Sequence, residues 1–334
     1  MRLSIIIVNY FSAKDICQCL ETACRFLRCE SYEWIIADNS SDVEGRQLVT
    51  GKYPFVRWID MGYNAGFARA NNKGIANATG DIVLLLNPDT LMRDDAIEQC
   101  FRRFAASEYI ACGVQLLNAD GSPQISGNYF IKGGINTLLP VPYLGALLRR
   151  LGYSLKVKKT NVPEATGHVE VDWINGAFVM VKKSSVEKAG MLDEDFFLYA
   201  EEIEWCGRLR KQGKLCIYGD LHVVHLEGQS ANAAFDSRGK GYYNMYDRKG
   251  RQIMLSNFVR IRKQFGKGWF LFGLCFYLLG IPFFLVGLLL SKLFRGKGSK
   301  YSFTQFKGYC ANVFFIAGKA GIILRNKPYF YKVI

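Results

Sequence analysis

The chain has 334 residues, half of them hydrophobic and 14% aromatic, which is enough for one large domain or two smaller ones. Its formal net charge of +14 would indicate nucleic-acid binding if it were spread over a folded surface. Residues 251–334, however, hold 14 Lys and Arg and no acidic residue, whereas residues 1–250 are neutral with 29 of each sign. A basic excess that flanks apolar sequence favours an anionic membrane surface and argues against nucleic acid as a partner.

The ten cysteines are irregularly spaced, and none forms a C-x-x-C pair. This pattern argues against a zinc site and predicts buried free thiols in a reducing compartment. The first residues run directly into an apolar strand, which is not the pattern of a signal peptide. We therefore expect the body of the chain to lie in the cytosol.

The first forty residues predict a βαβ unit. An apolar strand over 4–10 breaks at Asn9, helical periodicity follows over 13–28, and a second strand over 34–42 ends in a polar turn. Strand, helix and strand at this spacing imply a parallel pair, so Asp38 is expected beside the end of the first strand. A carboxylate there can accept from a ring N–H of a pyrimidine base, although Asp is also a common helix cap.

A glycine-rich segment follows a third short strand over 55–60. Gly62 and Gly66 allow a tight turn, and the helix after them is expected to offer free N–H groups to an anion. The segment is neither G-x-G-x-x-G nor a Lys-Ser/Thr phosphate loop. Nicotinamide enzymes and P-loop enzymes are therefore disfavoured.

Residues 79–90 hold the clearest candidate site. The run 82–86 is unbroken and apolar, as expected of a strand buried on both faces of a parallel sheet. Because Pro88 cannot donate to a sheet ladder, the chain leaves the sheet at Asn87 and presents Asp89 at the carboxyl end of a central strand. Oxygen ligands at this position suit a hard divalent cation that carries a diphosphate. The alternative is a turn without chemical function.

Residues 107–170 give weaker signals. The stretch 137–150 mixes leucines, two prolines and a basic end. It fits a lid, a surface that touches lipid, or an ordinary insertion loop, and the sequence does not separate these alternatives.

Carboxylates gather at the start of a helix predicted over 199–211. Glu201 and Glu202 lie near its start, where the helix dipole favours negative charge, so a structural role is one interpretation. Glu204 and Arg208 are four residues apart and are expected to pair. Three carboxylates within four residues repel one another, which favours a perturbed pKa in one of them.

A strand predicted over 215–218 leads to two histidines. His222 and His225 fall on opposite faces if the segment stays extended. A lone histidine is more often structural than a ligand, and only its surroundings favour His225.

The C-terminal quarter contains 22 uncharged residues from 269 to 290, about 33 Å as a helix, which is long enough to cross the apolar core of a bilayer. Lys267 and Lys292 flank it as interfacial anchors would. A buried core helix is the alternative, disfavoured because the segment has no polar face. A weaker apolar stretch over 309–324 carries Lys319, and we expect it to lie in the interface or to pair back as a hairpin.

In this order, the blocks over residues 3–230 resemble the family 2 glycosyltransferases, and among them the bacterial rhamnosyltransferase-like branch. The matching pieces are Ile7–Tyr10, Asp38–Asp42, Gly62–Phe67, Asn71–Gly74, Gly80–Asp81, Asn87–Thr90, Gly176–Ala177, Asp193–Phe197, Glu201–Glu202 and His225.

The resemblance implies an α/β, GT-A fold, in which a mostly parallel, Rossmann-like central sheet is flanked by helices. The glycosyltransferase domain is predicted over 1–250, with a nucleotide-sugar half over 1–106 and an acceptor half over 107–250. Residues 251–334 are predicted to form a membrane-associated helical region.

Site roles also follow from the resemblance. Asp38 is expected to contact the base and Asp81 to lie near the ribose or base, while Asn87 and Asp89 stand where the family has its metal-binding D-x-D. Asn87 replaces the first aspartate of that motif. Glu202 aligns with the catalytic base, and His225 with a residue that helps to hold the metal or diphosphate. Further donor contacts are expected from Asn9, Asn64, Gly66 and Asn71.

The implied reaction is inverting, dependent on Mg²⁺ or Mn²⁺, and moves one sugar from a dTDP- or UDP-linked donor to a lipid-linked or polysaccharide acceptor. The Q-x-x-R-W signature of processive synthases is missing. The expected location is the cytoplasmic face of a bacterial inner membrane. The competing class is a membrane-tethered nucleotide-binding or scaffold protein with an inactive site.

Overall fold

The computed structural model describes residues 1–129, 136–156, 161–226, 232, 234–237, 244–295 and 298–333. By its contacts the chain divides into two units. The first comprises Met1–Phe130, Thr160–Phe197 and Glu201–Ser230, and the second comprises Ile131–Lys159, Leu198–Ala200 and Ala231–Ile334. The second unit therefore includes the insertion 131–159 as well as the C-terminal region, and the predicted limit at residue 250 falls inside it.

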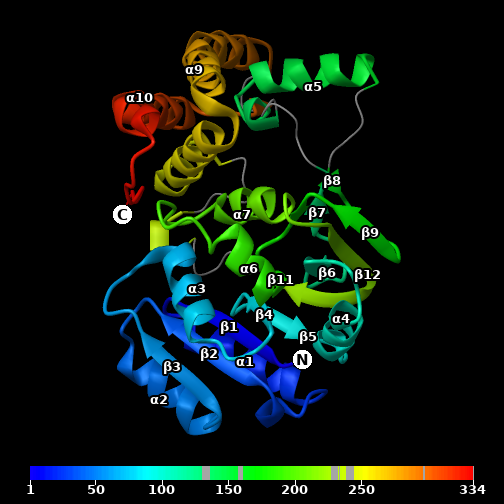
Figure 1. Cartoon of the computed structure of the whole chain (residues 1–334). Coiled ribbons are helices and arrows are strands. Elements are labelled where there is room, and N and C mark those ends of the chain that lie inside the picture. Colours follow the sequence, from blue (N-terminus) through cyan, green and yellow to red (C-terminus); the bar gives the residue numbers. More distant parts are fainter. Residues whose placement is uncertain are drawn as a thin grey trace. The chain divides into compact units, whose positions relative to one another are not determined.

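A nine-stranded mixed sheet organises the first unit (Figure 1), with eight strands in the order β3-β2-β1-β4-β11-β6-β12-β5 and β9 paired to β12. Its strands are β1 (Leu3–Asn9), β2 (Glu33–Asp38), β3 (Val56–Asp60), β4 (Ile82–Leu86), β5 (Thr90–Met92), β6 (Ala111–Leu117), β9 (His168–Val171), β11 (Phe178–Lys182) and β12 (Leu215–His225). A small second sheet contains β7 (Gly127–Asn128), β8 (Asn161–Val162) and β10 (Trp173–Ile174).

The half of the sheet formed by the early strands is parallel, as the sequence predicted. Strands β3, β2, β1 and β4 all run in one direction. The other half is not, because β11 is antiparallel to both β4 and β6, and β5 and β9 are antiparallel to β12. The α/β fold is confirmed, but its sheet is mixed.

Helices cover both faces of this sheet, and the strands alternate between two cores. Ile5, Ile7 and Trp34 face one core with helix residues such as Ile16, whereas Ile6 faces the other core with Ile75. The helices of the first unit are α1 (Ala13–Cys24), α2 (Val43–Lys52), α3 (Gly66–Asn77), α4 (Ala96–Ala105), α6 (Lys183–Ala189) and α7 (Glu201–Leu209), with a 3-10 turn, η1, over Cys29–Ser31.

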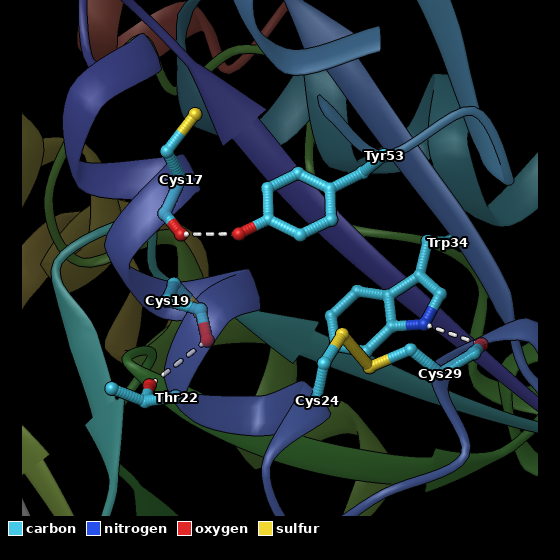
Figure 2. Close-up of a disulfide and its surroundings, with 7 residues drawn as sticks. All are labelled: Cys17, Cys19, Thr22, Cys24, Cys29, Trp34 and Tyr53. Carbon is cyan, nitrogen blue, oxygen red and sulfur yellow. Dashed lines mark hydrogen bonds between the residues drawn. A yellow bond between two sulfur atoms is a disulfide. The ribbon is translucent and has the colours of Figure 1, made fainter. Parts of the chain in front are cut away.

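The cysteine prediction is partly wrong. Figure 2 shows a disulfide between Cys24 at the end of α1 and Cys29 in η1, with Cα atoms 5.4 Å apart. The Trp34 indole beside it donates to the carbonyl of Cys29, at 3.1 Å. The other eight cysteines are free, and five of them are buried as predicted, whereas Cys275 is exposed.

The second unit is helical and contains α5 (Leu144–Ser154), α9 (Arg248–Arg295) and α10 (Phe303–Arg325). Gly266 has non-helical backbone angles (φ 89°, ψ −175°), so α9 consists of two helices in succession. Within the described residues, one helix is long and apolar enough to cross a membrane by length and composition, Arg248–Phe294, and one third of its most apolar window is buried. The segment 269–290 lies in its second part.

Helix α10 packs along α9, as the hairpin alternative predicted. A capping box at Ser302 starts α10, with Ser302 and Gln305 bonded reciprocally. Lys319 lies over the rings of Phe315 and Tyr329, so its charge contacts aromatic faces.

Candidate active site

Polar side chains collect at the carboxyl edge of the parallel strands. Asn9 pairs in register with Asp38, and Ile7 pairs with Leu86. Asn87, the next residue after β4, therefore reaches the same edge, where open α/β sheets bind ligands. Its backbone N–H donates to the carbonyl of Ala177, at 3.0 Å.

The Asp38 carboxylate is held rigidly. Its Oδ1 accepts from Asn9 Nδ2 at 2.8 Å, from the Ser40 backbone N–H at 2.9 Å and from Ser40 Oγ at 2.5 Å. Oδ2 accepts from none of the described residues, which leaves one oxygen for a donor on a ligand. Asn9 itself is fully buried, and its Oδ1 accepts from the Ser12 backbone N–H. Asn9 thus orients Asp38, which differs from the expected direct contact with a donor.

Pairing of β5 with β12 brings Asp89 to His225. Thr90 pairs in register with His225, and the Leu226 N–H donates to the carbonyl of Asp89 at 3.0 Å. His225 Nε2 lies 3.5 Å from Asp89 Oδ1 and 3.3 Å from Asn87 Nδ2. Three residues that are distant in sequence therefore meet at one point.

Gln124 fixes the tautomer of His225. Gln124 Nε2 lies 2.7 Å from the backbone carbonyl of His225 and 2.8 Å from Asn118 Oδ1, and a carbonyl can only accept. The oxygen of the Gln124 amide must therefore face His225 Nδ1, at 3.0 Å, and Nδ1 carries the proton. The lone pair of Nε2 is then directed toward Asn87 and Asp89, as a metal ligand requires.

This donor set suits a divalent cation. Asp89 supplies a carboxylate and His225 an imidazole nitrogen, and both side chains are largely buried. Across the described ranges no group of three or more His, Cys, Asp or Glu side chains is placed to hold a metal ion. A cation bound by these two residues needs further oxygens from a ligand or from water, which a diphosphate can provide.

The start of α3 differs from the prediction. The Gly66 N–H donates to Asn64 Oδ1 at 3.2 Å, and the Phe67 N–H donates to the carbonyl of Phe197 at 2.8 Å. Two backbone amides that were expected to bind an anion therefore make hydrogen bonds within the protein. Gly66 has φ +77°, and a Cβ there would lie 2.3 Å from the carbonyl oxygen of Phe197. Glycine at position 66 is thus required by close packing. Asn71 is 1% exposed and donates to Phe67 within its own helix, which makes it structural.

Asp81 is also not where the resemblance predicted. It precedes β4, at the opposite end of the strand from Asn87, and its carboxylate accepts from the backbone N–H of Arg2 at 2.8 Å. Five strand residues, about 16 Å, separate the two ends. Asp81 therefore lies at the amino edge and does not join the other candidate residues.

Glu202 lies beside the turn that adjoins Asn87. A Cβ on Gly176 would be 3.5 Å from Cγ of Glu202, and the next residue, Ala177, accepts from the Asn87 N–H. The Asn175 side chain shapes this turn by accepting from the Ala177 N–H at 3.0 Å. Glycine at position 176 thus leaves space next to the Glu202 side chain.

The helix that carries Glu202 is held firmly. Arg208 makes a bidentate ion pair with Glu204, as the spacing predicted, and also donates to the carbonyls of Ala189 and Met191. Two consecutive non-glycine residues with left-handed φ, Tyr199 (71°) and Ala200 (66°), precede the helix, a strained entry of the kind found at functional sites.

Burial perturbs one of the clustered carboxyls. Burial, and then the neighbouring charge of Glu202, raise the pKa of Glu201 well above its ordinary value. Among the described residues Glu201 Oε2 has no hydrogen-bond partner. The neutral acid is therefore the favoured form of Glu201, which spares Glu202 a second adjacent negative charge.

Sequence reasoning missed two residues of this region, Gln124 and Asp15. Helix α1 packs along β5, and the pKa of Asp15 is raised first by partial burial and then by the charge of Asp89. A second carboxylate on α1 thus lies near enough to Asp89 for their charges to repel. Neither residue stands in a recognisable motif, so the sequence carries no signal for either.

Comparison with known proteins gives the following matches. Residues 4–160 match the family model described as glycosyl transferase family 2. The low-salt glycan biosynthesis hexosyltransferase Agl10 of Haloferax volcanii is 32% identical over 216 residues, which cover 63% of this chain and 62% of that protein. The match thus spans less than two thirds of that relative.

Two bacterial relatives are named rhamnosyltransferases. Rhamnosyltransferase WbbL of Escherichia coli is 26% identical over 250 residues, covering 71% of this chain and 89% of WbbL. The N-acetylglucosaminyl-diphospho-decaprenol L-rhamnosyltransferase of Mycobacterium tuberculosis is 27% identical over 214 residues, covering 59% and 67% of the two chains.

Solved structures support the fold. The mannosyltransferase PcManGT of Pyrobaculum calidifontis, in complex with GDP-Man and Mn²⁺, aligns with a TM-score of 0.52 at 14% identity, covering 96% of this chain and 86% of that one. GalNAc-T7 with UDP, GalNAc and Mn²⁺ aligns with a TM-score of 0.51 at 12% identity, covering 79% and 50%. At these identities the likeness concerns the GT-A fold alone.

Proposed function

We propose that this chain is a family 2 glycosyltransferase that moves one sugar, with inversion, from a nucleoside diphosphate sugar to a lipid-linked or polysaccharide acceptor. Two relatives are named rhamnosyltransferases and one of these names includes a diphospho-decaprenol acceptor, which favours dTDP-rhamnose as the donor and a polyprenyl-linked saccharide as the acceptor. A UDP-hexose is the second choice of donor.

The proposal rests above all on the meeting of Asp89 and His225 beside Asn87. Within this arrangement, Asp38 accepts from the base of the nucleotide through its free oxygen. Asp89 and His225 would hold a divalent cation, and PcManGT, which has a similar fold, is in complex with GDP-Man and Mn²⁺. A cation bound there would neutralise charge on the departing diphosphate.

Glu202 is the proposed catalytic base. Inversion requires a base that takes the proton of the acceptor hydroxyl as its oxygen attacks the sugar carbon from the side opposite the diphosphate. Glu202 has the right chemistry, it is held on an anchored helix, and its neighbour Glu201 favours the neutral form. The space at Gly176 beside Glu202 is suited to the hydroxyl of an acceptor.

The matching test is Glu202→Gln, which keeps the shape of the side chain and removes the base. We expect transfer to fall by about 10² to 10⁴-fold, with nucleotide affinity nearly unchanged. Near wild-type turnover in this variant would show that Glu202 is not the base.

Hydrolysis of dTDP-rhamnose, measured with and without Mn²⁺ or Mg²⁺, tests the donor and the metal. Asn87 in place of a metal-binding aspartate is the observation that favours the alternative, an inactive nucleotide-binding protein. Nucleotide binding without turnover of any donor would support that alternative.

The apolar segment 269–290 is proposed to bring the catalytic unit to its lipid-linked acceptor at the cytoplasmic face of a bacterial membrane. Leu279, Phe283 and Val286 on this segment are each more than half exposed, which a core helix of a soluble protein would avoid. Release of the protein from membranes by salt or carbonate washing would contradict this assignment.

A further inference from the structure

Helix α5 lacks the packing that a helix of its length needs. It has 11 residues, and Gly145 is the only one of them that is buried. Isolated helices of this length are marginal in water, and most gain stability by packing an apolar face. The surface that α5 packs against is therefore largely missing from the described part of the chain.

The exposed apolar face of α5 is continuous along its axis. Leu147 and Leu151 are 50% and 51% exposed, and Leu155, just after the helix, is 76% exposed. Residues spaced by four lie on one face of a helix. Arg149 and Arg150 lie away from this face, at about 160° and 100° from Leu151 by helical geometry, and Lys156 follows just after the helix. This is the pattern of a helix that lies in the plane of a membrane interface.

The charge of the second unit fits an acidic surface. Its only acidic residues are Asp236 and Asp247, and its sequence holds 24 Lys and Arg. Basic residues near an anionic lipid surface strengthen binding to it.

The segment before α5 is attached to the apolar part of α9. Tyr277 Oη donates to the carbonyl of Thr137 at 2.6 Å, and a Cβ on Gly280 would lie 2.6 Å from Val141 Cγ1. A Cβ on Gly287 would lie 2.6 Å from Cδ2 of Tyr143. Glycine is therefore required at position 287 for α5 to begin beside α9. Figure 1 shows α5 next to the later part of α9.

Chain length then restricts the topology. Asn136 is seven residues from Tyr129, so the two residues can be at most about 25 Å apart. Lys156 is five residues from Asn161, which allows at most about 17 Å. Tyr129 and Asn161 belong to the first unit. The apolar core of a bilayer is about 30 Å thick, so neither connection can cross it.

We propose that α5 is a membrane-interface helix that binds acidic lipid on the side of the bilayer that faces the first unit, and that it keeps the segment 269–290 within that leaflet. Leu147, Leu151 and Leu155 enter the boundary between headgroups and acyl chains, and Arg150 and Lys156 contact phosphate headgroups. Because Gly287 is held beside α5, the segment enters the membrane without crossing it.

Photo-crosslinking tests the lipid contact. The full chain, with benzoylphenylalanine at Leu151, is reconstituted in vesicles of phosphatidylcholine and phosphatidylglycerol that carry an alkyne-labelled lipid. Leu48 on α2 is the matched control, because it is 47% exposed in the first unit. We expect lipid adducts at position 151 and none at 48, with the yield at 151 reduced severalfold by Arg150→Ala/Lys156→Ala. Adducts to a second copy or to another protein at 151, or no lipid adduct, would overturn the proposal.

A protease site inserted after Gly298, between α9 and α10, tests the topology. In vesicles with the first unit outside, we expect cleavage without detergent. Cleavage that requires detergent would mean that 269–290 crosses the bilayer. Neither experiment measures sugar transfer, so their outcome is independent of the proposed enzymatic function.

Discussion

Replacing Gln124 by Met should weaken metal binding although Gln124 touches no metal. Methionine has a similar volume but cannot accept from His225 Nδ1 or donate to the His225 carbonyl. Without this partner the imidazole can turn or adopt the other tautomer, in which Nε2 carries a proton and cannot bind a cation. Loss of such an orienting partner typically lowers metal affinity 10- to 100-fold.

The free energy of unfolding should also fall, because the substitution removes three hydrogen bonds and leaves two buried groups of His225, Nδ1–H and the backbone carbonyl, without this partner. An unsatisfied buried group costs about 1–3 kcal/mol. Loss of stability alone therefore does not establish the orienting role, and the control must lose stability in a similar way.

Gln115→Met provides that control. Gln115 is 1% exposed and makes hydrogen bonds to Leu116, Gln124 and Ala165, none of them to His225. Mn²⁺ affinity is measured by electron paramagnetic resonance of the free ion, with UDP present. We expect Gln124→Met to lose affinity and Gln115→Met to lose only thermal stability. Equal Mn²⁺ affinity in Gln124→Met and the wild type would refute the argument that Gln124 sets the tautomer.

Three further predictions concern stability. Since the folded state keeps the proton of Glu201 at pH values where the unfolded chain releases it, stability falls as the pH rises above about 4.5. Glu201→Gln should therefore raise the Tm at pH 8, and the Tm difference from the wild type should shrink toward pH 4.5. A Tm difference that does not change with pH would contradict the assigned pKa shift. Gly66→Ala should destabilise by about 1–3 kcal/mol through strain against Phe197, whereas Gly51→Ala, with open space around it, should not, so equal Tm changes in denaturation scans would refute this reasoning. Reduction of the Cys24 disulfide should cost about 2 kcal/mol by loop entropy, measured as a lower Tm with dithiothreitol, and Cys24→Ser should be insensitive to the reductant.

The parallel half of the sheet was predictable because β1 and β4 are short apolar runs, and the strand–helix–strand spacing of the first forty residues implies a parallel pair. The direction of β11 was not predictable. A short apolar run such as 178–182 fits a parallel or an antiparallel strand equally well. The direction of β11 depends on the path of residues 107–177, and the sequence of this stretch does not predict that path. Register and direction are properties of tertiary contacts rather than of local pattern.

The site was predictable where a strand end fixes a residue. Asp38 and Asn87 follow from the ends of β2 and β4. Asp81 was misplaced because the resemblance marked it as part of a matching block, although its position before the strand puts it at the opposite edge. Gln124 escaped notice because its partner His225 is 101 residues away and a single glutamine has no pattern.

Asn87 changes both the hydrogen bonding and the charge of the site relative to an aspartate at the same position. Its amide donates to the lone pair of His225 Nε2, a bond that an aspartate could not make and that must be broken when Nε2 binds a cation, because this nitrogen has one lone pair. The asparagine thus brings one negative charge fewer to the site than an aspartate would. A divalent cation bound by Asp89 and His225 alone would keep one positive charge, which a diphosphate can balance, and at short range in a buried site that attraction is strong. The cation and the nucleotide are therefore expected to bind as one unit, each raising the affinity for the other by the same factor.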